Sequence, residues 1–126
     1  ATTDDGTTPL YTAVLHDHIE VASLLIGGGA AVNQARTNDG VTPLYIVACN
    51  GHAEVASLLI SGGAAVNQAR TDNGETSIYV AACNGHAEVA SLLISGGAAV
   101  NQARTDNGET PIYVAACNGH AEVVSL

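Results

Sequence analysis

Histidine is the residue type in this sequence best suited to metal or acid–base chemistry, and it recurs at a fixed step. Four of the five histidines lie 34 residues apart, at His18, His52, His86 and His120. Equivalent side chains in neighbouring helical layers would lie about 8–10 Å apart, whereas a zinc ion needs its ligands within about 2.0–2.1 Å. We therefore expect each histidine to bond to loop backbone. The cluster His16-Asp17-His18 offers only an adventitious cation site.

The three cysteines keep the same step, at Cys49, Cys83 and Cys117. Layers about 9–10 Å apart exclude a disulfide between neighbours, because the two α-carbons of a disulfide lie within about 7 Å. No base stands beside any of them, as a nucleophile would need. An odd count at equal spacing favours free thiols in a reducing compartment, and we expect small, half-buried side chains. No catalytic residue, metal or cofactor is therefore expected, and the protein is not predicted to be an enzyme.

The glycine run at 27–29 has the composition of a phosphate-binding loop but lacks its chemistry. Such a loop requires a lysine, and the chain contains none. Two other units have Ser-Gly-Gly at the same place. We interpret the run as the end of a helix.

These columns belong to an internal repeat that covers the whole chain. The run from Cys49 to Thr71 recurs letter for letter from Cys83 to Thr105. The step divides a single domain, 1–126, into units that we place at 4–37, 38–71, 72–105 and a shortened 106–126. Self-similarity at such a period is the signature of a solenoid.

Each unit contains the signals of two short helices. In the second unit, Gly40 follows Asp39 in a tight turn, and Thr42 precedes a proline suited to the first helical position. The first helix is expected to end at Asn50-Gly51, and the second runs from His52 to Gly62-Gly63. Helices of two to three turns are marginal alone, so neighbouring units must stabilise one another.

The residues from Gly40 to Leu59 read G-x-T-P-L-Y-x-x-A-x-x-G-H-x-E-V-x-x-L-L, and G-A-x-V-N follows at 63–67. This pattern closely resembles the ankyrin repeat. The resemblance implies an all-α solenoid of stacked antiparallel helix pairs with hairpin-like loops, called fingers, and a concave face. It also implies a module that binds other proteins and does not catalyse.

Three departures from the family pattern bear on the structure. Tyrosine replaces the usual histidine of T-P-L-H in every unit, so its hydroxyl must bond differently or reach solvent. The third unit has Ser77 in place of the proline. Asp17 stands where the other units have glycine, and we expect modest backbone strain there.

Recognition can use only the positions that differ between units, which the resemblance places on the concave face and the fingers. They comprise the residues flanking the turn glycine and those at the end of the first helix. The predicted partner contacts are Asp5, Thr7, His16, Asp39, Val41, Asn50, Asn73, Glu75, Asn84, Asn107, Glu109 and Asn118.

The charge of the chain restricts the class of partner. The net charge is −9, with three arginines and no lysine. Nucleic acids and anionic membranes bind clustered cations, so neither is expected, whereas a basic protein fits. The apolar runs are too short to span a bilayer. We expect an intracellular, cytoplasmic protein.

Two further interpretations remain open. The near-identity of the units indicates recent duplication or consensus design, and the chain could then be a structural or engineered scaffold without a ligand. In the family some finger asparagines are hydroxylated, but Asn33, Asn67 and Asn101 lack the acidic residue favoured two positions earlier.

Both ends lack a polar capping repeat, so we also expect apolar end faces and end-to-end self-association.

Overall fold

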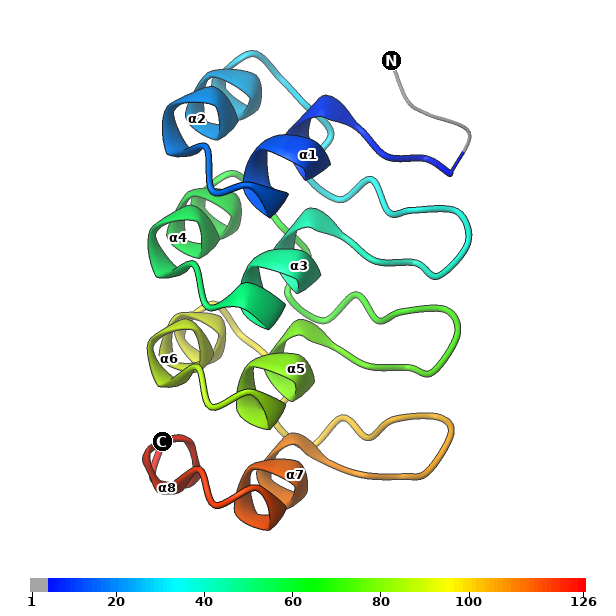
Figure 1. Cartoon of the computed structure of the whole chain (residues 1–126), viewed down its shortest axis with the longest axis vertical. Coiled ribbons are helices and arrows are strands. Elements are labelled where there is room, and N and C mark those ends of the chain that lie inside the picture. The colour runs from blue at the N-terminus through cyan, green and yellow to red at the C-terminus, as the bar shows by residue number, and fades with distance from the viewer. Residues whose placement is uncertain (1–4) are drawn as a thin grey trace.

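The computed structural model describes residues 5–126, and within them the chain forms a stack of four helix pairs without any strand (Figure 1). The all-α, stacked architecture implied by the resemblance is confirmed. Residue 4, where we placed the start of the first unit, lies outside the described residues. The helices are α1 (Pro9–Leu15), α2 (Ile19–Gly27), α3 (Pro43–Asn50), α4 (Ala53–Ser61), α5 (Ser77–Cys83), α6 (Ala87–Ser95), α7 (Pro111–Cys117) and α8 (Ala121–Val124).

A threonine precedes and caps the first helix of every pair. Its Oγ1 accepts a hydrogen bond from the backbone N–H of the tyrosine three residues later, at 3.0–3.3 Å, which satisfies one of the free donors of the first turn. Proline follows the threonine in α1, α3 and α7. Helix α5 begins at Ser77, the equivalent position. The threonine cap therefore sets the start of the helix without the proline.

The helices form two columns that run the length of the stack (Figure 1). The odd-numbered helices lie in one column and the even-numbered helices in the other, and the loops that follow the even helices project beyond the odd column. We call the loops 28–42, 62–76 and 96–110 the finger loops. The odd helices therefore lie between the even helices and the fingers.

The finger loops are hairpins tied to one another by backbone hydrogen bonds. In the first, Arg36 N–H bonds to Val41 O at 2.9 Å and Gly40 N–H to Arg36 O at 3.0 Å. Thr71 N–H then bonds to Asp39 O of the preceding finger at 2.9 Å. A Cβ on Gly40 would lie 2.7 Å from Thr71 N. The close contact between fingers therefore requires glycine at this position.

The core is a thin layer of small apolar side chains shared between neighbouring pairs. Leu44, Val47, Val55 and Leu59 are all fully buried or nearly so. Each such side chain contributes about 1.5–3 kcal/mol relative to exposure. Because most helices here have only seven to nine residues, their stability depends on this packing between layers.

Candidate functional site

The predicted contact residues just before each turn glycine serve the finger loops themselves. Asp5, Asp39, Asn73 and Asn107 each accept, through Oδ1, the backbone N–H of the residue two positions later, at 2.9–3.1 Å. Asparagine and aspartate commonly close turns in this way. These side chains fix the finger geometry. The first three are half-buried and Asn107 is exposed.

The column directly after the turn glycine is divided between burial and hydrogen bonding. Val41 is only 4% exposed and packs in the apolar core, which leaves little of its side chain for the partner contact predicted for it. Glu75 accepts the Tyr45 hydroxyl at 2.7 Å, and Glu109 accepts the Tyr79 hydroxyl at 2.8 Å. Two of the predicted contacts therefore join one layer to the next.

These pairs extend into a polar ladder between the odd helices and the fingers. Arg70 Nη1 donates to the Tyr45 hydroxyl at 3.3 Å, and Arg104 Nη1 lies 3.2 Å from Glu75 Oε2. Burial of the phenol raises the pKa of Tyr45 above its usual value of 10.0. Sequence analysis missed the ladder. The available signal was the spacing of 30 residues from Tyr45 to Glu75, repeated from Tyr79 to Glu109.

The histidine column bonds to backbone, as expected, in the last two layers. His86 Nε2 lies 3.0 Å from Cys49 O, and His120 Nε2 lies 2.9 Å from Cys83 O. Asn84 Nδ2 donates to the same Cys49 oxygen at 3.0 Å. Asn118 repeats that bond with Cys83, also at 3.0 Å. These two asparagines, predicted as partner contacts, therefore join neighbouring layers while their side chains remain at the surface.

The first layer junction departs from this pattern. Asp17 adopts a φ of 57°, the left-handed conformation that its replacement of glycine predicts. His52 Nδ1 is buried without a hydrogen bond among the described residues and lies 3.7 Å from Asp17 Oδ1.

Within residues 5–126, no three histidine, cysteine or acidic side chains group as metal ligands. The three cysteines are free, with Cys49 and Cys83 half-buried.

All three arginines are engaged by carboxylates. Arg70 Nε donates to Asp72 Oδ1 at 2.9 Å, and Arg104 Nε donates to Asp106 Oδ1 at 2.8 Å. Arg36 lies 3.8 Å from both Asp5 and Asp39. The Arg70 guanidinium lowers the pKa of Asp72, and Arg104 does the same for Asp106. Because all three arginines are paired with carboxylates, the rest of the surface is strongly acidic.

One column of predicted contacts remains fully at the surface. It lies at the carboxyl end of the odd helices and comprises His16, Asn50, Asn84 and Asn118. The side chain of Asn50 makes no hydrogen bond among the described residues. The half-exposed thiols of Cys49 and Cys83 lie next to this column in the sequence. The column presents hydrogen-bonding groups and no catalytic combination.

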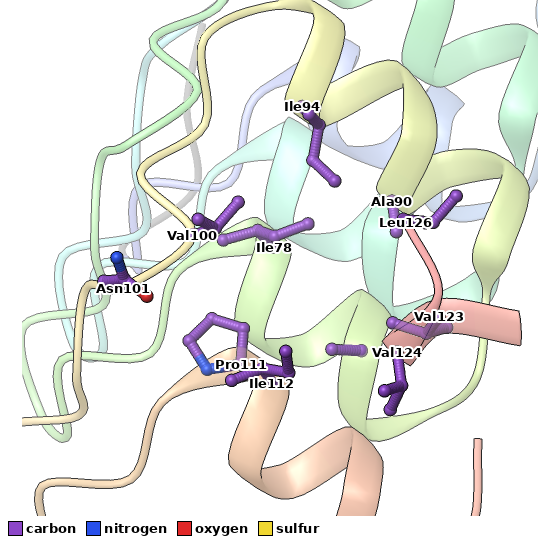
Figure 2. A pocket seen from close by; sticks show the side chains of 11 residues that line it. Ile78, Ala90, Ile94, Val100, Asn101, Pro111, Ile112, Val123, Val124 and Leu126 are labelled. Carbon is purple, nitrogen blue, oxygen red and sulfur yellow. The ribbon is translucent and has the colours of Figure 1, made fainter. Parts of the chain in front are cut away.

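A small apolar cavity lies where α5, α6, α7 and α8 meet, with a volume of about 140 Å³. Figure 2 shows Ile94 on one side and Pro111 and Ile112 on the opposite side. No titratable side chain lines it, so it offers neither a nucleophile nor an acid–base group. Its lining residues are Ile78, Ala82, Ala90, Ile94, Val100, Asn101, Pro111, Ile112, Val123, Val124 and Leu126.

The repeat, the helix pairs and the tied fingers agree with a known family. A family model described as ankyrin repeats (3 copies) matches residues 1–70 and 63–126, which together span the chain. The chain belongs to the ankyrin-repeat family. Ankyrin repeats are generally protein–protein interaction modules and are typically not enzymes. No curated protein matches the chain. None of the helices described in this ankyrin-repeat chain is long and apolar enough to cross a membrane.

Proposed function

We propose that this ankyrin-repeat chain binds a protein partner along its inner surface. We define the inner surface as the exposed column at the ends of the odd helices, His16, Asn50, Asn84 and Asn118, together with the finger loops. The observation that supports the proposal is the rigid presentation of these groups. Backbone bonds tie each finger to the next, so partner binding would cost little ordering entropy.

The charge distribution favours a basic partner. Asp72 and Asp106 remain about two-fifths exposed although each is paired with an arginine. Glu20, Glu54, Glu88 and Glu122 are exposed at the start of the even helices. Complementary charges accelerate association and select partners. A nucleic acid would meet the same negative field and be repelled.

Substitution of Asn50 tests the inner surface with little risk to the fold. An Asn50→Arg variant adds a bulky cation where the native side chain is exposed and makes no bond among the described residues. We expect it to abolish saturable capture of the partner from a cell lysate, while Ser57→Arg, on an exposed position of α4, leaves capture unchanged. Equal capture by both variants would contradict the proposal.

The alternative is a structural or engineered scaffold without a ligand of its own. It is supported by the use of variable residues within the stack, since Val41 is buried and Glu75 and Glu109 bond to tyrosines of the preceding layer. A scaffold predicts that no protein is captured in a saturable manner by the wild-type chain. The experiment above therefore separates the two functions.

Hydroxylation of the finger asparagines receives less support. Both ends of the Asn33 amide are engaged, with Ala65 N–H at 2.7 Å and Gly63 O at 3.3 Å. Asn67 makes the same two bonds one layer later. All three asparagines are exposed, and Asn101 makes neither of these bonds among the described residues, so it is the remaining candidate substrate. The free cysteines support an intracellular, cytoplasmic location, which we propose with the binding function.

We also propose that the chain associates with itself, because both outer faces of the stack expose apolar side chains. Val21 of the first pair is 49% exposed, whereas its equivalent Val55 is fully buried. Ile112 of the last pair is 54% exposed, whereas its equivalent Ile78 is only 3% exposed. The face around Val21 corresponds to the surface that a preceding layer covers in the later pairs. The face around Ile112 corresponds to the surface that a following layer covers in the earlier pairs. The two faces are therefore complementary to each other.

A further inference from the structure

The second and third layer junctions share two hydrogen bonds that the first junction lacks. At the second junction, Asn84 Nδ2 and His86 Nε2 each lie 3.0 Å from the carbonyl oxygen of Cys49. The third junction repeats both bonds at the carbonyl oxygen of Cys83. Each of these carbonyl groups, near the carboxyl end of an odd helix, is therefore satisfied by the following layer.

At the first junction, three polar groups at or beside these positions make no hydrogen bond among the described residues. Leu15 O, the equivalent of Cys49 O, accepts none. The Asn50 side chain makes none either. The Asp17 carboxylate, whose side chain is 45% exposed, lies 3.7 Å from His52 Nδ1, beyond hydrogen-bonding distance. These three groups are therefore available to a ligand, with no bond within the stack to break.

The carbonyl and the carboxylate are close enough to contact one ligand group. A Cβ on Gly85 would lie 2.7 Å from His120 Nδ1, and Nε2 of the same ring lies 2.9 Å from Cys83 O. One imidazole ring therefore spans the distance between this carbonyl oxygen and the Cβ position two residues later. At the first junction that Cβ belongs to Asp17 and that carbonyl to Leu15. The loop that carries them lies beside the end of α3 in the stack (Figure 1).

We propose that the first junction is a binding site for the guanidinium group of an arginine, supplied by the basic partner. A guanidinium is a planar group with five N–H donors and no acceptor, and it pairs well with carboxylates. The Asp17 carboxylate accepts a charge-assisted hydrogen bond, while Leu15 O and Asn50 Oδ1 accept from the remaining N–H groups. The chain's own arginines do not fill the site, because all three lie in the finger loops.

The site would fix the register of a partner along the inner surface. Asn84 and Asn118 make the same bond in successive layers, so a partner that shifts by one layer there meets the same groups again. The group of acceptors at the first junction differs from both. The inference rests on the proposed function for the identity of the partner, but the site itself is tested without one.

The compound N-acetyl-arginine methylamide tests the site on the intact chain, with its neutral citrulline analogue as the ligand control. We expect saturable changes in the NMR chemical shifts of the Asp17 and Asn50 backbone amides with the arginine compound only. Asp17→Asn removes the charge and keeps a residue that tolerates the left-handed conformation, so it should weaken binding about tenfold. Glu88→Gln, the matched control, removes an exposed carboxylate of α6 and should bind as wild type does.

Asp17→Gly is a second variant, which separates loss of the site from loss of the fold. Glycine stands at this place in the later units, so His52 can then bond to Leu15 O. We expect a protein that unfolds thermally no earlier than wild type but no longer binds the arginine compound.

The proposal is overturned if the arginine compound does not bind in a saturable manner or if the citrulline compound binds equally. It is also overturned if Asp17→Asn and Asp17→Gly bind the arginine compound as well as wild type does. Capture of a protein partner from a lysate is a separate measurement. Failure of one experiment therefore shows which of the two proposals is wrong.

Discussion

His52 Nδ1 lies 3.7 Å from the carboxylate of Asp17, whereas its equivalents His86 and His120 reach backbone carbonyls of the preceding layer. The reason lies in the residue that each ring covers. A Cβ on Gly51 would lie 2.6 Å from His86 Nδ1, and one on Gly85 would lie 2.7 Å from His120 Nδ1. Aspartate at the equivalent position leaves no room for that arrangement, so His52 forgoes the carbonyl bond.

Replacement of Asp17 by glycine should therefore stabilise the protein. Asp17 has a φ of 57°, and a left-handed conformation costs a non-glycine residue roughly 1–2 kcal/mol. Glycine loses part of this gain through its greater freedom in the unfolded chain, while His52 regains a carbonyl partner. We expect the free energy of unfolding of Asp17→Gly to rise by about 1 kcal/mol, measured by urea denaturation.

The reciprocal substitution is the control. Gly51→Asp should lower the free energy of unfolding by more than about 1 kcal/mol, because it adds both backbone strain and a collision with His86. An Asp17→Gly protein no more stable than wild type would show that the Asp17–His52 contact compensates fully for the strain.

Glu75 is the central member of the polar ladder and should contribute more to the free energy of unfolding than its equivalent Glu109. It contacts both the Tyr45 hydroxyl and Arg104 and is only 14% exposed. Glu75→Val introduces the residue that stands at the equivalent position 41 of the preceding unit, so a valine side chain is tolerated in this column. We expect a loss of about 1–2 kcal/mol in the free energy of unfolding, because the buried Tyr45 hydroxyl loses its acceptor.

A double-mutant cycle separates the ladder from general packing effects. Arg104→Gln should couple to Glu75→Val by about 0.5–1 kcal/mol. It should couple less strongly to Glu109→Val, because Arg104 makes a side-chain ion pair with Glu75 and reaches Glu109 only through the Tyr79 hydroxyl that both contact. Equal coupling in both cycles would argue against a specific Glu75–Arg104 contact.

The repeat made the fold accessible from the sequence, because each helix start depends on one local signal. Thr42 and Thr76 cap their helices whether proline or Ser77 follows. The predicted ends at Asn50-Gly51 and Gly62-Gly63 are confirmed, since α3 ends at Asn50 and α4 ends just before Gly62. These features need only a few neighbouring residues to be recognised.

The candidate site was harder to predict because variation between units has two causes. A residue can differ because it faces a partner or because it matches a different neighbour in the stack. Val41 and Glu75 occupy the same column, yet the first is buried and the second accepts a hydrogen bond from Tyr45. Only the contact between layers distinguishes these cases. His16 and Asn50, by contrast, are exposed.

The buried phenol of Tyr45 should make stability depend on alkaline pH. Burial raises its pKa in the folded state above the value of 10.0 usual for tyrosine. This contribution is present in full below pH 10 and is lost as pH rises above it, because the unfolded chain then releases the proton first. We expect the free energy of unfolding to fall above about pH 10 more steeply for wild type than for Tyr45→Phe, by up to about 1.4 kcal/mol per pH unit.

Urea denaturation of both proteins between about pH 8 and pH 11 measures this difference. Tyr79, whose pKa burial also raises, is present in both proteins and cancels in the comparison. Parallel pH profiles would show that Tyr45 ionises equally in the folded and unfolded chain.

Self-association through the two outer faces should be head-to-tail, so that the last helix pair of one molecule contacts the first helix pair of the next. Val21→Glu charges the face of the first pair, and Ile112→Glu charges the face of the last pair. Wild type should form species that grow with concentration, because a head-to-tail contact does not close on itself. Each variant alone should remain a monomer, since a buried unpaired carboxylate costs several kcal/mol, roughly.

An equal mixture of the two variants gives the decisive result. Val21→Glu keeps the face around Ile112, and Ile112→Glu keeps the face around Val21, so the mixture should form a one-to-one dimer and nothing larger. Sedimentation velocity at several concentrations measures the species, with Ser57→Glu, exposed on α4, associating like wild type. If either variant alone still associates, or if the mixture stays monomeric, the two faces do not bind each other, because a head-to-tail contact needs one intact face of each kind.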